Sequence, residues 1–423
     1  TYADNVTITK LAEEVEKQWA DYQANPVGYF DSDELMELDT MIGGKGINDP
    51  ALVETLCSNS ADAIDWLGEQ GITLHSVSSF GGASVKRIHR PVDAEGKTLS
   101  VGSYMIPLLE ENCQKAGVQM MLNTTATEIL TDDNGAAVGI KATGASGETI
   151  TINAKAVVLT TGGFGANLDM VVEYKPELKG FMTTNAPGIL GQGIKMAQAI
   201  GADTVDMDQI QIHPTVEANT AALITEGLRG DGAILVNADG KRFFNESGTY
   251  ENILHADEYQ KGHCHYTLFD ANWPEQTKQF KMHGCSRVHP FENGADPNIL
   301  WSVFAEKMLP GLIEKGFVVK ADTIEELARK LGLPEKTLKA TVERYNTLAQ
   351  NGKDEDYGKE PHRLAALTKA PFYGAKNTGY ILCTMDGIRI DTTMNAIDTD
   401  GNPIPGLYVI GNDSGGFFAN TYP

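Results

Sequence analysis

The stretch Ala156-Val-Val-Leu-Thr-Thr-Gly-Gly163 decides the fold. Its almost wholly apolar run is typical of a strand that is buried on both faces in a parallel sheet. Gly162 and Gly163, which end the run, allow a ligand to approach the backbone closely. The stretch therefore predicts a parallel sheet with a ligand beside the turn that follows this strand.

The flanking segments extend this prediction. Before the stretch, the runs 127–130, 137–141 and 149–152 alternate apolar and polar residues between glycine-containing turns, which predicts an antiparallel β-meander. After it, Gly191-Gln-Gly193 opens a predicted helix over 194–200. The free N–H groups and positive dipole of that helix suit an anionic or electron-rich ligand.

Composition restricts the class of protein. The chain has 423 residues, 41% of them apolar, which supports a large core divided into two or three domains. A formal net charge of −23 makes nucleic acid and anionic membrane surfaces unfavourable partners. No apolar run approaches the roughly 20 residues that span a bilayer, and no signal-peptide pattern occurs. We therefore predict a soluble protein that is not an integral membrane protein.

The five cysteines are far apart, odd in number, and form neither a CxxC pair nor a CxxCH haem-attachment motif. A disulfide framework is therefore not expected. Cys264 lies in Gly262-His-Cys-His265, where adjacent residues rarely converge on one tetrahedral ion. We predict a solvated loop at this segment and no metal site.

Helical signals are clearest near the start of the chain. Leu11, Val15 and Trp19 have helical spacing within a predicted helix over 8–22. Asp49-Pro50 supplies an N-cap and a first-turn proline for a helix over 51–70. Further predicted elements are a strand at 72–77, a helix at 101–115 and a strand at 118–122.

Two polar segments have the composition of a reaction centre. Ile210-Gln-Ile-His-Pro-Thr215 and Thr225-Glu-Gly-Leu-Arg-Gly-Asp-Gly232 place an imidazole, a carboxylate and a guanidinium in two turns. A strand-like run at 233–237 and a hairpin turn at 238–241 follow, so these residues are expected at the mouth of a rigid element. For 80–91, a glycine-rich turn followed by cations and a histidine, a solvated basic loop and a functional loop are equally open.

Further motifs follow in order through nearly the whole chain: Asn48-Asp-Pro-Ala-Leu-Val53, Gly81-Gly-Ala-Ser-Val85, His89-Arg-Pro91, Leu159-Thr-Thr-Gly-Gly-Phe164, His213-Pro-Thr215, Gly240-Lys-Arg-Phe243, Asn245-Glu246 and Ile404-Pro-Gly-Leu-Tyr408. Together they resemble the soluble members of the fumarate reductase and succinate dehydrogenase flavoprotein family. The resemblance implies an α/β fold, in which a glutathione-reductase-type FAD-binding domain (1–207, completed by 384–423) is interrupted by a mobile α+β capping domain (208–383).

The resemblance also implies the cofactor site. FAD is the expected cofactor, and its expected contacts are Gly81, Gly82, Ala83, Ser84, Thr161, Gly162, Gly163, Asn185, Gly191, Asn412 and Asp413. Family members begin with a GxGxxG unit that holds the ADP part of FAD and continue beyond the position of Pro423. We therefore expect this chain to be a fragment, or the ordered portion, of a longer protein. In the capping domain, helices at 301–312, from Thr323 and at 335–349 are expected to pack as ordinary core.

The chain departs from the family's pattern in three active-site segments. Tyr250 stands where it implies an arginine proton donor, Leu382-Cys383 where it implies two histidines, and Thr421 where it implies an arginine. Groups that hold or protonate a dicarboxylate are thus replaced, which argues against fumarate as the substrate.

The remaining residues still suit reduction of a polarised C=C bond, which requires hydride from reduced flavin at one carbon and a proton at the other. Tyr250 is the predicted proton donor, and Arg229 with Glu226 the predicted relay; a structural ion pair and a packed tyrosine are the alternative. His213 and Thr225 are expected to hydrogen-bond the activating carbonyl or carboxylate. Other predicted substrate contacts, in an aromatic and largely uncharged wall, are Tyr380, Cys383, Thr384, Phe418 and Thr421.

We therefore predict an FAD-dependent ene-reductase acting on the CH–CH group of an enoate or enone, such as an aryl-acrylate or a steroid-like enone. Its expected electron donor is a haem or flavin module or protein, and its expected process is anaerobic respiration. We expect the protein in a bacterium, either in the cytoplasm or outside it. Three alternatives stay open. They are a fumarate reductase with Arg389 or Arg229 in a rebuilt clamp, a ketosteroid-type dehydrogenase, and a flavin-free binding or scaffold protein.

Overall fold

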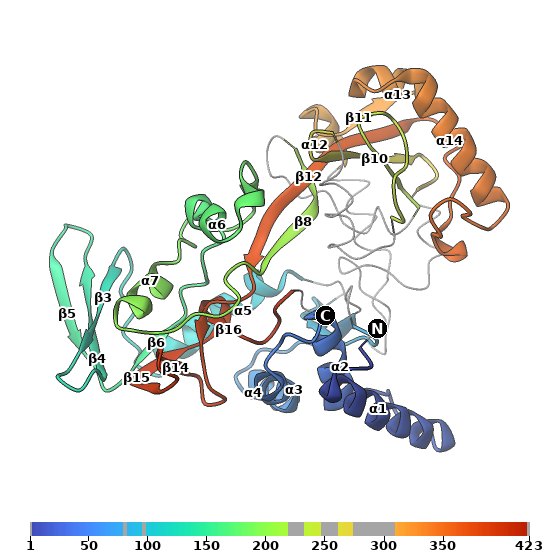
Figure 1. The fold of residues 1–423 in the computed structure, drawn as a ribbon. Coiled ribbons are helices and arrows are strands. Elements are labelled where there is room, and N and C mark those ends of the chain that lie inside the picture. Colours follow the sequence, from blue (N-terminus) through green and yellow to red (C-terminus); the bar gives the residue numbers. More distant parts are fainter. Residues whose placement is uncertain are drawn as a thin grey trace.

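The computed structural model of the protein describes residues 2–78, 83–94, 99–218, 232–246, 261–273 and 309–420. Within these ranges the chain forms two lobes joined by two long antiparallel strands, β8 (Ile210–Glu217) and β12 (Phe372–Thr384) (Figure 1). The first lobe holds α1 to α7 and the C-terminal strands, and the second holds β9 to β11 and α12 to α14. The predicted domain boundaries at 208 and 383 fall near the beginning of β8 and the end of β12, respectively.

Four helices begin the first lobe: α1 (Val6–Ala24), α2 (Asp33–Gly43), α3 (Pro50–Ser58) and α4 (Ser60–Glu69). The Asp49 carboxylate accepts the Ala51 N–H at 2.9 Å, as its N-cap pattern predicts. The single helix predicted over 51–70 is wrong, because the helix is interrupted at Asn59, between α3 and α4. There the side chains of Ser58 and Asn59 donate to carbonyls of the preceding turn and compete with the helical backbone.

Around the next helix, α5 (Val101–Lys115), the strand predictions fare differently. The strand predicted at 72–77 is displaced to β1 (Ser76–Ser78), which pairs with β2 (Ile88–Arg90). The strand predicted at 118–122 is wrong: these residues form no strand, and the Val118 N–H donates to the Cys113 carbonyl at the end of α5.

The predicted meander is confirmed as an antiparallel sheet of β3 (Thr125–Thr131), β4 (Ala137–Thr143) and β5 (Thr149–Asn153). The opening stretch forms β6 (Val157–Leu159), which pairs in parallel with β15 (Pro403–Val409), and β15 pairs antiparallel with β14 (Asn395–Ile397). Burial of this stretch on both faces is not observed, since Val158 is 54% exposed.

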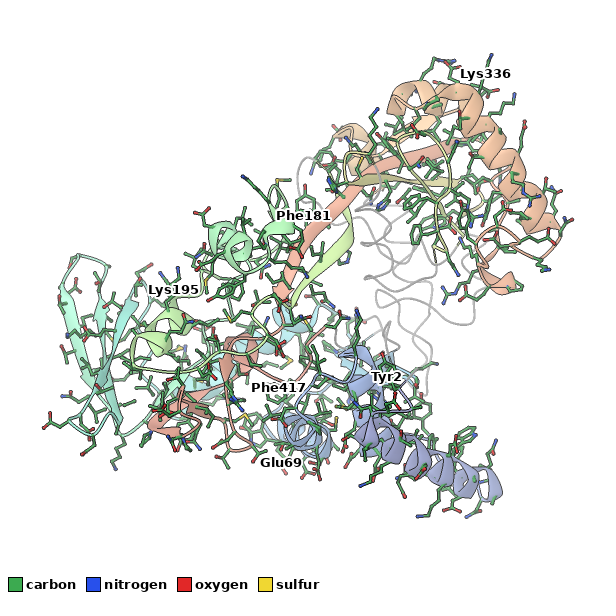
Figure 2. All side chains as sticks on the ribbon, viewed as in Figure 1. Tyr2, Glu69, Phe181, Lys195, Lys336 and Phe417 are labelled. Carbon is green, nitrogen blue, oxygen red and sulfur yellow. The ribbon has the colours of Figure 1, made fainter. Side chains whose placement is uncertain are left out.

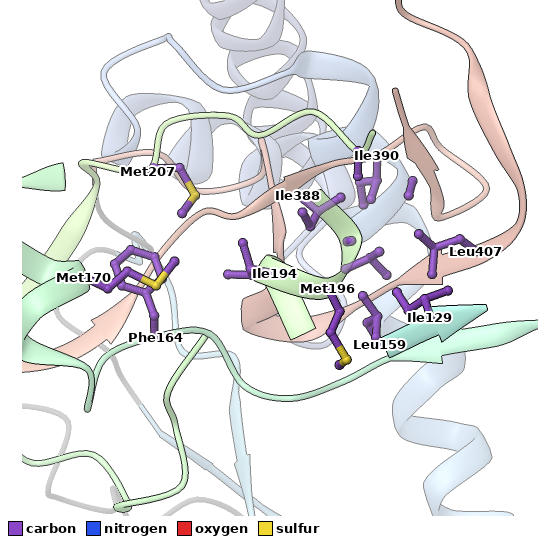
Figure 3. Packing of buried hydrophobic residues seen from close by; sticks show 14 of the residues in the cluster. Ile129, Leu159, Phe164, Met170, Ile194, Met196, Met207, Ile388, Ile390 and Leu407 are labelled. Carbon is purple, nitrogen blue, oxygen red and sulfur yellow. The ribbon is translucent and has the colours of Figure 1, made fainter. Parts of the chain in front are cut away.

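The segment after β6 contributes α7 to the core beside this sheet. It contains α6 (Leu168–Tyr174), η1 (Pro176–Leu178), β7 (Met182–Thr183) and α7 (Gln192–Ala199). Figure 3 shows Ile194 of α7 in a core with Leu159, Phe164 and Leu407. The C-terminal part adds β13 (Ile388–Arg389), η5 (Gly411–Asp413) and β16 (Ser414–Gly415), with β13 parallel to β16.

The second lobe is built on β12. Its sheet has the order β11-β12-β10-β9, with β7 and β8 also paired to β12. The elements are β9 (Ile234–Val236), β10 (Cys264–Asp270), α12 (Leu309–Glu314), β11 (Val319–Ala321), α13 (Ile324–Leu331), α14 (Glu335–Gln350) and η4 (Pro361–Arg363).

Two predictions for the second lobe have clear outcomes. Leu338, Val342 and Tyr345 of α14 are buried, as their helical spacing predicts, and the Thr323 hydroxyl caps α13. The solvated loop predicted around Cys264 is wrong, because Cys264 and His265 begin β10, a central strand whose two faces are both covered. The predicted helix at 301–312 lies mostly outside the described residues. Among the described helices, none is both long and apolar enough to cross a bilayer.

Candidate functional site

A buried carboxylate fixes the glycine turn after β6. Asp413, from η5, accepts hydrogen bonds from the Thr161 backbone N–H, from Thr161 Oγ1 at 2.9 Å and from the Gly163 N–H at 2.9 Å. Gly162 and Gly163 have φ of +88° and +81°, a conformation that glycine adopts without steric cost. These predicted cofactor residues therefore form one preorganised turn at the carboxyl end of β6.

The end of β12 packs directly on this turn. Thr384 Oγ1 accepts the Phe164 N–H at 3.4 Å, and a Cβ at Gly163 would lie only 2.2 Å from that oxygen. The same Cβ would lie 2.9 Å from the Asn412 carbonyl oxygen. Thr384 and Asn412 are thus in contact with the turn, and residue 163 has room for no side chain.

The N-terminus of α7 lies against the same turn. Gly191, with φ of +75°, is the N-cap residue of α7, and its N–H donates to the Gly163 carbonyl at 2.9 Å. Within the described part of the chain no side chain caps α7, and a helix N-terminus of this kind favours an anionic group. This arrangement fits FAD, whose pyrophosphate and carbonyl oxygens are hydrogen-bond acceptors.

Asn185 connects this region to β12. Its amide nitrogen donates to the carbonyl oxygens of Ile381, at 3.1 Å, and Leu382, at 2.9 Å. The predicted cofactor residue is therefore engaged with the strand that also carries the predicted substrate contacts.

A second carboxylate holds the other predicted cofactor loop, in which Ala83 and Ser84 are described while Gly81 and Gly82 lie outside the described residues. Asp39, buried on α2, accepts the Ser84 N–H at 2.9 Å and Ser84 Oγ at 2.5 Å. Arg87 donates to Asp39 at 2.7 Å and pairs with Asp31. The Ser84 hydroxyl is therefore committed to Asp39.

The predicted substrate contacts on β8 and β12 are neighbours. His213 is buried and lies opposite Tyr380 in the strand pair. The Tyr380 ring is fully buried, and its hydroxyl donates to the Glu217 carbonyl at 3.0 Å. Tyr380 thus supports the strand pair through its hydroxyl.

Cys383 lies one residue before Thr384. Its Sγ is 3.7 Å from Gln211 Oε1 and 3.6 Å from Met385 Sδ. Burial raises the pKa of the Cys383 thiol to about 12, so this side chain is neutral at pH 7.

Phe418, which is predicted to line an aromatic wall, lies with Phe417 in the turn after β16. The rings of Phe417 and Phe418 are tilted with their centroids 6.3 Å apart. Figure 2 shows Phe417 in the first lobe, and the neighbouring Gly416 packs against Leu52 of α3.

The remaining predicted residues Thr225, Glu226, Arg229, Tyr250 and Thr421 lie outside the described residues, so their roles stay predictions. Arg389, considered above for a rebuilt clamp, is 58% exposed and pairs with Asp203 at 3.6 Å. Sequence patterns do not single out two buried carboxylates of this region. Asp39 binds Ser84, and Asp386, which follows β12, binds the Gly416 N–H, so both have partners that are distant in the chain. For both, an acidic residue within an apolar stretch is the only sequence signal.

Comparisons with known proteins agree on one family. A family described as "FAD binding domain" matches residues 19–423. NADH:fumarate oxidoreductase of Klebsiella pneumoniae (strain 342) is 37% identical over 92% of this chain, and urocanate reductase of Eggerthella lenta is 32% identical over 92%. The chain spans 38% and 60% of the lengths of these two relatives. The solved open conformation of a flavocytochrome c3 fumarate reductase matches 95% of this chain and 65% of its own length, with 33% identity and a TM-score of 0.74.

Proposed function

The chain belongs to the family of fumarate reductase-like FAD-binding flavoproteins, and from this we propose that the whole protein reduces an activated C=C bond. FAD is the family's cofactor. The proposed substrate is an enoate or enone other than a simple dicarboxylate.

The neutral wall beside the cofactor turn is the observation that carries this proposal. Leu382 and Cys383 stand next to Thr384, which touches the turn at Gly163, and the Cys383 thiol carries no charge at neutral pH. Leu382, Cys383 and Thr384 offer no cation to a second substrate carboxylate, which would lose its hydration at these side chains without gaining an ion pair from them. An aryl or alkyl substituent would instead gain apolar contact there. One relative is named for urocanate, an aryl-substituted acrylate, which supports the same substrate class.

The chain's own residues have three tasks in this proposal. Asp413 and Thr384 hold the glycine turn, and the uncapped first turn of α7 receives acceptor groups of the cofactor. Bound FAD, once reduced, supplies the hydride. His213 hydrogen-bonds the activating carbonyl or carboxylate, which stabilises the negative charge that develops on its oxygen as the β-carbon gains hydride. Tyr250 then gives its proton to the α-carbon and regains one through Arg229 and Glu226.

The proposed electron source is a haem or flavin module or protein that returns two electrons to FAD after each turnover. The solved structure of a flavocytochrome c3 fumarate reductase supports a haem donor of this kind.

An anaerobic substrate screen tests the proposal. The full-length flavoprotein is reduced chemically, and its reoxidation is followed with fumarate, acrylate, aryl-acrylates and cyclic enones. We expect an aryl-acrylate or enone to be fastest, and Tyr250→Phe to lower that rate by at least about 100-fold. Tyr22→Phe is the control, because Tyr22 lies on α1 and its hydroxyl donates to the Gly28 carbonyl just after that helix, outside the predicted site.

Three results would contradict the proposal. If fumarate reacts fastest, the substrate is a dicarboxylate after all. If Tyr250→Phe keeps full activity, Tyr250 is not the proton donor. If the full-length protein shows no flavin absorption band, the flavin-dependent reaction is wrong.

A further inference from the structure

The turn that carries Phe417 and Phe418 is held from two sides. On one side, Asp386 Oδ1 accepts the Gly416 N–H at 2.5 Å. On the other, the Gly416 carbonyl accepts the Asp49 N–H at 2.8 Å, and the Phe417 carbonyl accepts Asn48 Nδ2 at 2.6 Å. The backbone of the aromatic turn is therefore held by hydrogen bonds on both sides.

The backbone of this turn is strained. Gly416 has φ of +100°, and Ala419, which is fully buried, has φ of +50°. A left-handed alanine costs free energy and persists only where surrounding contacts impose it. A cavity of about 410 Å³ beside Gly415 and Gly416 leaves space into which the turn can relax. The hydrogen bonds from Asp386, Asp49 and Asn48 hold the turn in place, together with close packing at Gly415 and Gly416.

Asp386 is an unusual anchor because it is almost completely buried. Its second oxygen, Oδ2, has no hydrogen-bond partner among the described residues. Burial, followed by the charges of Asp206 and Asp208 before β8, raises its pKa to about 7, although the N–H groups of Gly416 and Ala419 act in the opposite direction. Other charged groups nearby are engaged elsewhere: Arg389 pairs with Asp203, and Asp413 binds the turn at Thr161.

The position of Asp386 separates its effect from that of the cofactor contacts. Thr384, two residues earlier, touches the turn at Gly163, whereas Asp386 touches the turn at Gly416. Between the two turns, a Cβ at Gly387 would lie 2.3 Å from the Asp413 carbonyl oxygen, so the backbone is closely packed here. A change at Asp386 should therefore move the aromatic turn while leaving the glycine turn in place.

We propose that Asp386 is a specificity-determining positioning residue, whose carboxylate holds Phe417 and Phe418 against the substrate and thereby favours flat aryl-substituted enoates over small ones. This inference rests on the proposed function for its substrate class. It adds a residue outside the predicted site and a reason why discrimination depends on pH. Protonation of Asp386 weakens the bond to the Gly416 N–H, so preference for the aryl substrate should fall as the pH drops below about 7.

The test compares full-length wild type with Asp386→Asn and with Asp398→Asn. Asp398 is a suitable control because its carboxylate also accepts two turn N–H groups, from Asp400 and Asn402, but in an exposed turn of the same lobe. Hydrogen exchange of the Gly416 and Ala419 amides reports the turn without any substrate. Binding of an aryl-acrylate and of acrylate, followed by the flavin absorption spectrum at pH 6 and pH 8.5, reports discrimination without turnover.

In Asp386→Asn we expect faster exchange at Gly416 and Ala419, an aryl-to-acrylate affinity ratio about tenfold lower at pH 8.5, and loss of its pH dependence, with flavin content unchanged. Asp398→Asn should match wild type. Unchanged exchange, or faster exchange with an unchanged ratio, would overturn the role of Asp386. If no enoate is reduced by any variant, the proposed function fails, while the exchange and binding data still decide the role of Asp386.

Discussion

Replacing Arg242 by methionine should destabilise the second lobe strongly, because Arg242 is the centre of a buried ion network. Its guanidinium donates to Glu246 at 2.8 Å through both Nε and Nη2, and to Asp354 at 2.8 and 3.3 Å. Lys359, also buried, lies 3.6 Å from Glu246. The rings of Tyr345 and Tyr357 are 4.8 and 5.2 Å from the guanidinium carbon.

The expected size of the effect follows from what the substitution leaves behind. Removing one member of a buried pair typically costs about 3–5 kcal/mol, because the remaining charge is uncompensated. Here Glu246 keeps Lys359, and Asp354 keeps backbone N–H donors from Asp356, Tyr357 and Lys359. We therefore expect a loss near the lower limit, about 3 kcal/mol.

Arg344→Met is the matched control. Arg344 makes the same two-pronged contact to a carboxylate, with Nη2 2.7 Å and Nε 3.1 Å from the Asp356 oxygens, but its side chain is 50% exposed. Water already solvates this pair, so its loss should cost less than about 1 kcal/mol. Urea unfolding followed by circular dichroism gives both values, provided that the slopes m agree among the variants.

The pH dependence provides an internal check on this reasoning. Burial acts to raise the pKa of Glu246, but Lys359 and Arg242 outweigh it and hold that pKa below its ordinary value. The stabilisation is thus present above the unfolded-state pKa, near 4, and is lost as the pH falls through the folded-state pKa. Wild type and Arg242→Met should converge at low pH. Equal losses in Arg242→Met and Arg344→Met at pH 7 would refute burial as the cause.

Three further predictions use the first lobe and α13. Gly163→Ala should lower flavin content and destabilise the protein by more than about 2 kcal/mol, because the new Cβ would lie 2.2 Å from Thr384 Oγ1. Gly147→Ala is the control: Gly147 has a similar φ of +84° but open space around it, so this substitution should cost about 1 kcal/mol. Burial raises the pKa of Asp386 from 3.8 to about 7, which favours the protonated carboxyl in the native state. As the pH rises from 4 to 8, the free energy of unfolding of wild type should therefore fall by up to about 4 kcal/mol relative to that of Asp386→Asn, measured by thermal unfolding. A difference that does not change with pH would contradict the raised pKa. Thr323→Ala should cost about 1 kcal/mol in urea unfolding and Ser100→Ala almost nothing, because only Thr323 makes a capping hydrogen bond.

Local patterns predicted the elements whose stability is local. The alternation in β3 to β5 and the helical stripe of α14 are repeated within a few residues, so each is legible from a short window. The break at Asn59 was not predicted, because apolar periodicity continues across it while side-chain hydrogen bonds decide the backbone. The buried strand β10 was not predicted either, since a strand covered on both faces has no alternation to read.

The site is harder to predict because its contacts join distant positions. Asp413 and Thr161 are 252 residues apart, and Asp39 and Ser84 are 45 apart. No spacing rule connects such pairs. The family resemblance supplied Asp413, Ser84 and the glycines as cofactor residues, but it says nothing about Asp386, whose partner is a backbone N–H 30 residues away.

The strand pair between the lobes also changes how the predicted substrate residues should be assigned. Tyr380 and Ile381 of β12 pair with β7 of the first lobe, and the Ile381 carbonyl accepts the Thr184 N–H. Ile381 belongs to the first-lobe core together with Ile210 and Ile212 of β8. The part of β12 up to Thr378 pairs with β10 and β11 of the second lobe, and register shifts follow Thr378 in its pairing with β8. His213, Cys383 and Thr384 therefore lie on the part of the strand pair that is bonded to the first lobe, and we expect them to keep their distance to the glycine turn if the second lobe moves as the predicted capping domain.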